Sequence, residues 1–478
     1  MDTREFRKWA HEMADWMADY LETVEERPVR AAVEPGDIAK RLPSTPPEAG
    51  EDMGRIFADF RETILPGITH WQHPAFFAYF PANSSPPSVL AEMLTATLGA
   101  QCMSWQTSPA ATELETRVME WLSQLIGLPE GFTGCIQDTA STASLCALLS
   151  ARERATDFAS NRSGMAGQGR MTVYCSEETH SSIEKDVGIA GFGRENLRKI
   201  AVDDSYAMRP DLLSEAIDRD VAGGFTPVCV VATIGTTGAG GIDPVAAIAK
   251  ICRKHGIWLH VDAAWAGSAL VLPEHRWMIE GIEGADSFLF NPHKWLFTNF
   301  DCTAYFVRDP AALVQTFEIT PEYLKTAEGD RVVNYRDWGI QLGRRFRALK
   351  LWFVLRHYGA FGLRQAIGGH IAMTRRLVER MQADQDWEVV ADSGLALFCF
   401  RWLPAGIADP VRVDSLNEAL MQRVNATGRA YFTHTRLRGR YVIRWSVGQT
   451  ATEERHVEAA WALVRETAAV LAVEAGVG

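Results

Sequence analysis

The sequence has few of the features that mark membrane-spanning, secreted or nucleic-acid-binding proteins. No apolar run approaches the roughly 18–20 residues that cross a bilayer, and residues 1–26 mix charges without the apolar core of a signal peptide. Acidic side chains outnumber basic ones, so the formal net charge is −12 and the pI is near 5.6. Such a balance argues against nucleic acid or an anionic membrane as the main partner. We therefore expect a cytoplasmic protein that acts on a small molecule.

The cysteines and glycines also lack the spacings of common binding motifs. None of the eight cysteines forms a CxxC pair, and most lie in apolar stretches such as PVCVVAT. They indicate reduced, mostly buried thiols, and we expect no metal site. The stretch GTTGAGG at 235–241 fits neither GxGxxG nor a Walker A pattern, so it is weak support for a dinucleotide site.

The chain does contain a regular alternation of apolar, β-rich runs and helical segments between residues 86 and 310. Runs such as MTVYC, IWLHVDAA and CTAYFV are typical of strands buried on both faces of a mainly parallel sheet. We predict an α/β fold with three parts, namely an N-terminal helical arm and connector (1–85), a large domain (86–375) and a smaller α+β domain (376–478). The last part should end in a helix over 453–473.

The N-terminal segment 3–25 has an apolar stripe at helical spacing, followed by a proline-rich stretch at 27–50 that reads as an extended connector. The stripe either packs on its own domain or packs across a dimer, and we favour the dimer. Its members are Phe6, Trp9, Met13, Trp16, Met17, Tyr20 and Val24.

Four short polar segments are predicted at strand ends, where an α/β sheet binds its ligands. Each has a simple structural explanation, such as a helix N-cap in QDTASTAS (137–144) or a loop histidine in EETHSS (177–182). The other two are HVDAAWAG (260–267), which ends an apolar run with Asp262, and NPHKW (291–295), which places Lys294 among aromatic residues.

Together, these segments meet the requirements of one cofactor, pyridoxal 5′-phosphate. The cofactor needs a lysine for a Schiff base, an acid at its ring nitrogen, a phosphate cup and a flat group against the ring. Lys294, Asp262, residues 139–141 and His180 supply these in turn. Desolvation among His293 and Trp295 favours Lys294 as a nucleophile rather than as a surface charge.

Over nearly its whole length, the chain resembles the aromatic-L-amino-acid decarboxylases, which belong to the group II pyridoxal-phosphate-dependent decarboxylases. The resemblance rests on HPAFFAYFP, SPAATELE, HVDAAWAGSA, NPHKWLF and LGRRFRALKLWFVLR, which occur in that order. It implies a fold type I homodimer with shared active sites, a helical arm packed on the partner, and decarboxylation of tryptophan, phenylalanine, tyrosine or DOPA to the arylalkylamine.

The resemblance also implies roles for individual residues. Lys294, Asp262 and His180 match the family's Schiff-base lysine, ring-nitrogen partner and ring-stacking histidine. Tyr335 matches a mobile-loop tyrosine, so it is the expected donor of the proton to Cα, on a lid predicted at 324–336. The expected contacts to the cofactor further include Thr139, Ala140, Ser141, Thr237 and Asn291, and those to the substrate include Trp71, Tyr79, Phe80, Pro81, Ala82, Met103, His180 and Gly359.

Three other functions compete with decarboxylation. An aldehyde synthase on the same scaffold would carry phenylalanine at the loop tyrosine, an aminotransferase would need an arginine for the α-carboxylate, and a nucleotide-binding protein would share only the fold. Substrate choice is suggested by Ala82, where catechol-handling relatives carry a hydroxyl, and by Met103 and Gly359, which leave room for an indole. We expect tryptophan or phenylalanine to be used at least as well as DOPA.

Overall fold

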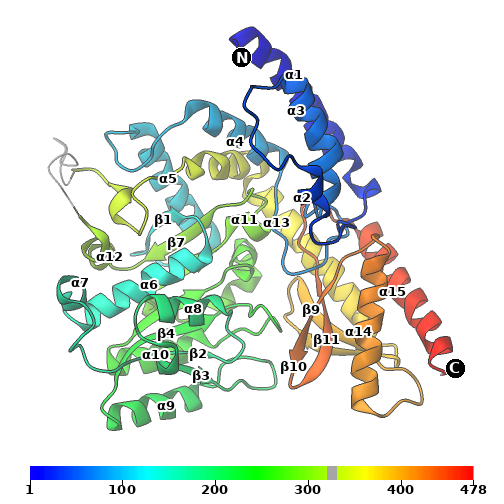
Figure 1. Cartoon of the computed structure of the whole chain (residues 1–478). Helices are drawn as coiled ribbons and strands as arrows, with labels where there is room; N and C mark the ends of the chain where they lie inside the picture. The colour runs from blue at the N-terminus through cyan, green and yellow to red at the C-terminus, as the bar shows by residue number, and fades with distance from the viewer. Residues whose placement is uncertain (320–330, 477–478) are drawn as a thin grey trace. The chain divides into compact units, whose positions relative to one another are not determined.

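The computed structural model describes residues 1–319 and 331–476 and divides into two compact units, whose elements Figure 1 labels. The smaller unit comprises Met1–Pro81, Asp384–Glu388 and Phe400–Gly478, and the larger unit comprises Ala82–Ala383 and Val389–Cys399. The first and last segments of the chain thus belong to the same unit. The breaks at residues 81 and 383 lie close to the predicted boundaries at 85 and 375, and the three-part division itself stays a prediction.

The larger unit is built on a seven-stranded sheet in the order β1-β7-β6-β5-β4-β2-β3. β7 is antiparallel to both β1 and β6, whereas β2, β3, β4, β5 and β6 run parallel. This arrangement confirms the predicted α/β fold with a mainly parallel sheet. The strands are β1 (Thr133–Gln137), β2 (Met171–Ser176), β3 (Leu197–Ile200), β4 (Thr226–Thr233), β5 (Trp258–Asp262), β6 (Ser287–Phe290) and β7 (Thr303–Val307).

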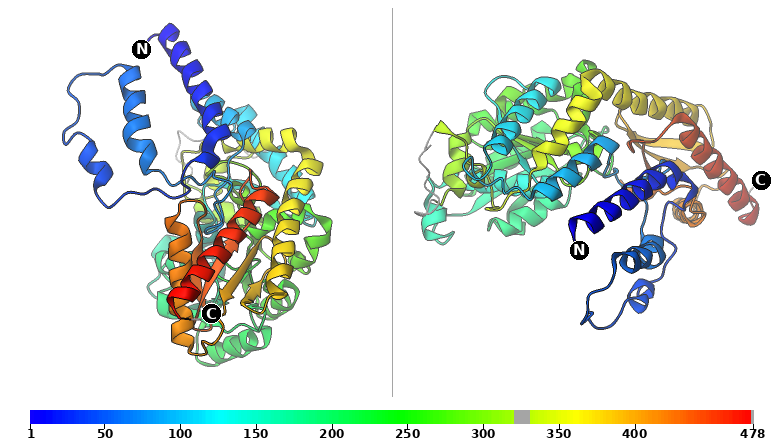
Figure 2. Two further views of the ribbon diagram at one scale, coloured as in Figure 1. Left: turned by 90° about the vertical axis from the view of Figure 1, so that its right-hand side faces the viewer. Right: turned by 90° about the horizontal axis from the view of Figure 1, so that it is seen from above.

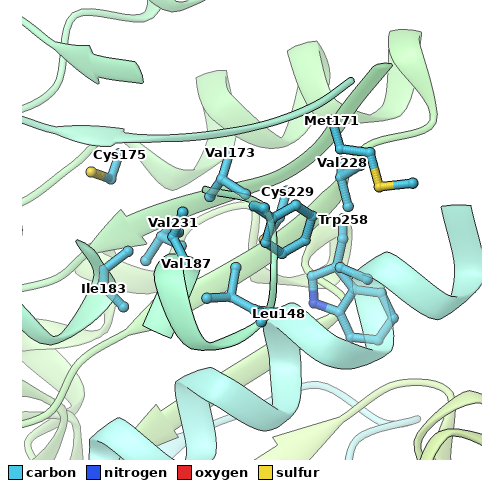
Figure 3. Close-up of a cluster of buried hydrophobic side chains, with 13 residues drawn as sticks. Leu148, Met171, Val173, Cys175, Ile183, Val187, Val228, Cys229, Val231 and Trp258 are labelled. Atoms are coloured by element: carbon cyan, nitrogen blue, oxygen red, sulfur yellow. The ribbon is translucent and has the colours of Figure 1, made fainter. Parts of the chain in front are cut away.

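Most strand residues are buried because helices cover the sheet, and β2 and β5 are buried at every position. Figure 3 shows part of this core, where Leu148 of α6 and Ile183 and Val187 of α8 pack onto side chains of β2, β4 and β5. The helices of this unit are α4 (Pro86–Leu98), α5 (Pro109–Ile126), α6 (Ala140–Ala155), α7 (Ala159–Ser163), α8 (Ser182–Ile189), α9 (Pro210–Ala222), α10 (Val245–His255), α11 (Pro292–Trp295), α12 (Pro310–Phe317) and α13 (Arg347–Gln382).

The smaller unit joins N-terminal helices to a C-terminal α+β part. β10 and β11 form an antiparallel hairpin, which belongs to a four-stranded sheet in the order β10-β11-β9-β8. Helices α14 and α15 lie side by side in both views of Figure 2. Its elements are α1 (Thr3–Thr23), α2 (Asp37–Arg41), α3 (Met53–Asp59), α14 (Pro410–Ala426), β10 (Thr433–Leu437), β11 (Arg440–Ser446) and α15 (Glu454–Glu474), and α15 confirms the helix predicted at the C-terminus. The strands β8 (Trp387–Asp392) and β9 (Leu397–Trp402) are divided between the two units, because Val389–Cys399 belong to the larger one.

The N-terminal helix is confirmed as α1, and the structure shows what its apolar stripe contacts within its own unit. The ring of Trp9 lies 6.4 Å from that of Phe57 of α3, and the ring of Trp16 lies 5.3 Å from that of Phe60. No residue of α1 is fully buried, however, and Phe6 remains 56% exposed. The segment at 27–50, expected to be extended throughout, contains the short helix α2.

Two further expectations concern the chain as a whole. All eight cysteines are free and buried, as predicted from their apolar contexts. Within residues 1–319 and 331–476, no helix is both long and apolar enough to cross a bilayer.

Candidate active site

Asp262 lies at the carboxyl end of β5, between the ends of β4 and β6, as the sequence predicted. Its side chain is buried, and its Oδ1 accepts a hydrogen bond from the backbone N–H of Ala264 at 2.9 Å. Burial raises the pKa of the Asp262 carboxyl, while the cation of Lys294 and the imidazole of His180 act in the opposite direction. A cationic partner at this position therefore favours the ionised carboxylate.

Lys294 lies in the short helix α11, directly after β6. The backbone N–H of Lys294 donates to the carbonyl of Asn291 at 2.9 Å, and the side-chain amide of Asn83 donates to the backbone carbonyl of Lys294. The indole of Trp295 beside it is buried and donates to Nδ1 of His370 at 3.0 Å. Because these contacts fix the backbone on both sides, the half-buried Lys294 side chain projects from a rigid turn.

His180 follows the carboxyl end of β2 and completes a group of three with Asp262 and Lys294. Its Nδ1 lies 2.8 Å from the hydroxyl of Ser182 at the start of α8. The ring is exposed at its rim, but partial desolvation lowers the pKa of His180, and the Lys294 cation lowers it further. The lowered pKa favours the neutral form of the imidazole. A neutral ring is compatible with the predicted stacking of His180 on a cofactor. The structure thus brings together the three residues that the sequence predicted from separate segments.

The N-terminus of α6 carries the residues predicted to form a phosphate cup. Thr139 is the N-cap, and its hydroxyl accepts a hydrogen bond from the N–H of Thr142 at 3.3 Å. Ala140 and Ser141 are the first two residues of the helix, so their backbone N–H groups belong to the set that has no partner within the helix. Such a terminus attracts a phosphate through these N–H groups and through the helix dipole.

Asn291, also predicted to contact the phosphate, is tied to the same end of the sheet. Its Oδ1 accepts a hydrogen bond at 2.9 Å from the hydroxyl of Thr303, which also lies 3.2 Å from the carbonyl of Asp138 just before Thr139. Thr237 lies in the turn after β4 and is exposed. The cofactor contacts of Thr237 and Asn291 stay predictions.

The residues predicted to contact the substrate fall into both units. Trp71, Tyr79, Phe80 and Pro81 belong to the smaller unit, where the rings of Trp71 and Tyr79 stack with centroids 5.6 Å apart. These two rings are 37% and 47% exposed. Ala82, Met103 and Gly359 belong to the larger unit, with the Met103 carbonyl accepting from the N–H of Arg336 at 2.9 Å and Gly359 at φ 61° in a kink of α13. Their substrate contacts stay predictions.

Tyr335 does not lie on an exposed lid. Its side chain is 2% exposed, its hydroxyl lies 2.8 Å from that of Thr116 on α5, and its ring packs against Trp338 and the guanidinium of Arg344. This placement disagrees with the interpretation of Tyr335 as a mobile-loop residue, because a buried hydroxyl engaged with α5 is part of the core. Of the lid predicted at 324–336, residues 324–330 lie outside the described part of the chain.

The segment between α12 and α13 contains one other tyrosine, Tyr323, in the stretch TPEYLK. Tyr323 lies outside the described residues. The prediction named Tyr335, in the stretch VVNYRDW, rather than Tyr323. An apolar pattern does exist there, since Val333, Tyr335 and Trp338 belong to one core cluster, and this pattern could have identified Tyr335 as buried.

Two other residues of the site were missed. Asn83 holds the Lys294 turn through its side chain, and its backbone N–H donates to the carbonyl of His293 at 2.9 Å. Its position directly after the aromatic stretch FFAYFPA was the available signal. Asp186 of α8 is a buried carboxyl group whose pKa is raised mainly by burial and in addition by the charge of Asp262.

The donor set fits pyridoxal 5′-phosphate. A lysine amine, a buried carboxylate, a neutral imidazole and a helix N-terminus follow strands at the same edge of the sheet, and each corresponds to one chemical group of that cofactor. In the described ranges, no group of three or more His, Cys, Asp or Glu side chains could hold a metal ion.

Comparison with known proteins points in the same direction. The sequence profile of the pyridoxal-dependent decarboxylase conserved domain matches residues 35–403. The chain is 43% identical to phenylacetaldehyde synthase of Arabidopsis thaliana, over 98% of this chain and 97% of that protein. It is 41% identical to tyrosine decarboxylase 1 of Narcissus pseudonarcissus, over 98% and 94%. The crystal structure of Oryza sativa TDC with PLP and tryptamine superposes with a TM-score of 0.96 at 37% identity, covering 98% of this chain and 99% of that one.

Proposed function

The chain belongs to the pyridoxal-dependent decarboxylase family, and we propose that it converts aromatic L-amino acids to the arylalkylamine and CO2. The observation that carries this proposal is the grouping of Lys294, Asp262 and His180 at the carboxyl ends of three parallel strands. The relatives support the aromatic substrate class, because they include a tyrosine decarboxylase and a TDC solved with tryptamine.

Each residue of the site has a distinct task in this reaction. When bound, pyridoxal 5′-phosphate supplies an electron-accepting ring that takes up the electron pair released as the substrate carboxylate leaves as CO2. Asp262 keeps a proton on the ring nitrogen by presenting a buried carboxylate. Lys294 holds the cofactor covalently through Nζ, and the α6 N-terminus binds the phosphate. The neutral imidazole of His180 covers the ring face and orients the substrate.

The attachment point is tested by chemical trapping. Borohydride reduction of the loaded enzyme followed by peptide mapping should place the cofactor on Lys294, and Lys294→Ala should abolish amine formation. Lys250 on α10 provides a matched control, because Lys250→Ala should leave the label and the activity unchanged. A label on any lysine other than Lys294 would overturn the site assignment.

An aromatic aldehyde synthase is the second candidate, because the Arabidopsis relative at 43% identity is named for that activity. The two reactions differ in their products, since the synthase route consumes oxygen and releases aldehyde, ammonia and peroxide. An oxygen electrode and a peroxide assay beside the amine assay separate them. Amine without oxygen uptake supports decarboxylation, and aldehyde with stoichiometric peroxide supports the synthase.

Position 82 supports a preference for substrates without a ring hydroxyl. Alanine offers no hydrogen bond to such a hydroxyl, and a buried hydroxyl without a partner costs about 1–3 kcal/mol. Competition between phenylalanine, tryptophan and DOPA should therefore show tryptophan or phenylalanine used at least as well as DOPA, with Ala82→Thr shifting the ratio towards DOPA. A wild-type preference for DOPA of about tenfold that Ala82→Thr leaves unchanged would exclude this role.

We further propose that the protein is a homodimer in which the N-terminal arm packs on a second copy. Support comes from α1 and α3, whose apolar side chains form an open groove of about 290 Å³. Phe6, Leu21 and Ile56 remain 56%, 41% and 44% exposed. The groove is lined by Met13, Trp16, Met17, Met53, Ile56, Phe57 and Phe60. Apolar area of this kind is stabilised when a second surface removes it from water.

Light scattering coupled to size exclusion tests the dimer. The wild type should elute at twice the chain mass, and Ile56→Glu should shift it towards the monomer. Val411→Glu serves as the control, because Val411 on α14 is 73% exposed and lies outside the groove. A wild-type monomer at micromolar concentration would contradict the proposal.

A cytoplasmic location is supported by the eight free, buried cysteines, because thiols persist in reducing compartments. Cell fractionation should recover the activity with cytoplasmic markers, and recovery with a membrane or secreted fraction would contradict this assignment.

A further inference from the structure

Asp186 is a buried carboxyl group that the proposed reaction leaves without a task. It lies on α8, on the same face as Ile183 and Val187, which point into the apolar cluster of Figure 3. The residue is 3% exposed, and its Oδ2 is buried without a hydrogen-bond partner among the described residues. An apolar side chain would satisfy this position better, because an unpaired buried polar atom is costly. Packing alone therefore does not explain an aspartate here.

The fold places α8 next to the candidate active site. The chain enters α8 directly from His180, and the hydroxyl of Thr179 lies 3.4 Å from that of Thr233 at the end of β4. Thr233 is the cross-strand neighbour of Asp262. Ile183 and Val187, on either side of Asp186, share a cluster with Val231 near the same end of β4. Asp186 thus belongs to a helix that packs near the carboxyl ends of β4 and β5, and Asp262 is the last residue of β5.

Charged and titratable groups from three elements act on Asp186. Burial raises the pKa of the Asp186 carboxyl to about 7, with Lys185 of α8 lowering it and Asp262 of β5 raising it. Burial raises the pKa of the Cys146 thiol of α6, and the charge of Asp186 adds to that rise. Coupling between two titrating groups is reciprocal, so the proton on Asp186 favours the ionised form of Asp262.

We propose that Asp186 acts on the cofactor through Asp262, as the second carboxyl group of a pair that holds one proton in acid and none above neutral pH. In acid, Asp262 carries the single negative charge and Asp186 carries the proton. Above neutral pH, Asp186 releases its proton to solvent and adds a second negative charge behind the ring nitrogen. Asp186 thus sets the amount of negative charge behind the ring nitrogen without touching the cofactor. This inference rests on the proposed function because it concerns the bound cofactor.

The pair predicts a change in the colour of the loaded enzyme. A second negative charge stabilises the positively charged form of the bound cofactor, so it raises the pH at which the cofactor absorbance changes. Asp186→Asn removes that charge at every pH while keeping the size of the side chain. The absorbance midpoint should therefore fall by about half a pH unit or more in Asp186→Asn. Asp186→Leu, which suits the apolar face of α8, should give the same fall and guards against an effect particular to asparagine.

A matched control separates charge at this site from the loss of any buried carboxylate. Asp220 of α9 is also buried, and it pairs with Arg198 at 3.0 Å rather than acting on Asp262. Asp220→Asn should leave the absorbance midpoint at the wild-type value. If Asp186→Asn and Asp186→Leu both keep the wild-type midpoint, the carboxyl pair is excluded.

Cofactor-free protein provides a second measurement that does not depend on the proposed function. A carboxyl group that keeps its proton when folded but loses it when unfolded makes stability fall as pH rises between the two pKa values. From pH 5 to pH 8, the wild type should lose denaturant resistance relative to Asp186→Asn. A constant difference across that range would overturn the inference, whereas protein that shows this fall but never binds pyridoxal 5′-phosphate would overturn the proposed function alone.

Discussion

At Asp262, burial and charge act in opposite directions, and the balance defines what the residue can do. Burial raises its pKa, and the Lys294 cation lowers it. A buried carboxylate in this setting is stabilised most by a protonated ring nitrogen, because the opposite charge compensates for the hydration that burial removed.

Asp262→Ala should therefore lose several kcal/mol of transition-state stabilisation, which corresponds to a rate on the order of 10³-fold lower or more. Asp262→Glu should lose less if the longer side chain still reaches the ring nitrogen. Steady-state kinetics with saturating cofactor measures both. An alanine variant with near-wild-type kcat would remove Asp262 from the mechanism.

The two tyrosines between α12 and α13 separate a structural role from a chemical one. Tyr335→Phe removes a hydroxyl that pairs with Thr116 in the core, so it should cost about 1 kcal/mol of stability and leave the amine product unchanged. Tyr323→Phe removes the only other phenol of this segment, and if that phenol donates the proton to Cα, amine formation should fall while aldehyde and peroxide rise. Product analysis of both variants decides between them, and a loss of amine confined to Tyr335→Phe would restore the original interpretation of Tyr335.

Residues that follow an apolar strand could be predicted from the sequence, and residues held by long-range contacts could not. Asp262 ends a buried strand and Lys294 lies in the turn after another, so their place at the sheet edge follows from chain order. Asn83 contacts Lys294, more than 200 positions away, and its only local signal is its position after the aromatic stretch FFAYFPA. Tyr335 was misplaced for a related reason, because its burial depends on α5.

At the scale of elements, a buried series of hydrogen bonds links helix α6 to β5, the strand that carries Asp262. Ser144 of α6 lies 3.1 Å from Nε2 of His260, whose Nδ1 lies 2.8 Å from the hydroxyl of Ser287 on β6. The indole of Trp258 donates to the same hydroxyl at 2.9 Å. Burial lowers the pKa of His260 to about 3, so the ring is neutral and its two nitrogens can donate to one neighbour and accept from the other.

Ser287→Ala should destabilise the protein by about 1–3 kcal/mol, because it removes the hydroxyl that pairs with the buried indole N–H of Trp258 and with Nδ1 of His260. Ser163→Ala is the control, since the exposed Ser163 hydroxyl bonds only the carbonyl of Ala159 within α7, and the change should stay within about 0.5 kcal/mol. Urea denaturation compares them. Equal urea midpoints for the two variants would show that the hydrogen bonds of Ser287 contribute nothing to stability.

Strands and helices were predictable where their sequence pattern is long and uninterrupted. The apolar runs at β2, β4, β5 and β7 and the helical pattern of α15 were recognised from the sequence. The antiparallel direction of β7 was not, because strand direction depends on how the chain crosses the sheet. The helix α2 was missed because its five residues lie within a proline-rich stretch.

At the scale of the whole molecule, buried histidines determine how stability responds to acid. Burial lowers the pKa of His73 and His370 to about 4 and that of His260 and His293 to about 3. Between about pH 6.5 and these lowered values, each histidine binds a proton mainly in the unfolded state, so each contributes stability that is lost as pH falls through that range. Asp186 and Asp243, with pKa values raised to about 7, act in the opposite direction, but they are fewer.

The cofactor-free protein should therefore be more stable at pH 6.5 than at pH 4.5, with a slope of about 1.4 kcal/mol per pH unit for each proton by which the unfolded state exceeds the folded state. Guanidinium denaturation across this range measures the slope. A protein that is equally stable at both values would contradict the assignment of these histidines as neutral.

The central claim is that this site removes CO2 from aromatic L-amino acids, and carbon tracing tests it most directly. The enzyme is loaded with pyridoxal 5′-phosphate and given L-tryptophan or L-phenylalanine labelled with 13C at the carboxyl group. We predict labelled CO2 and unlabelled tryptamine or phenylethylamine in equal amounts, with neither product from Lys294→Ala. Labelled carbon that stays in the amino acid or in a keto acid would contradict the account.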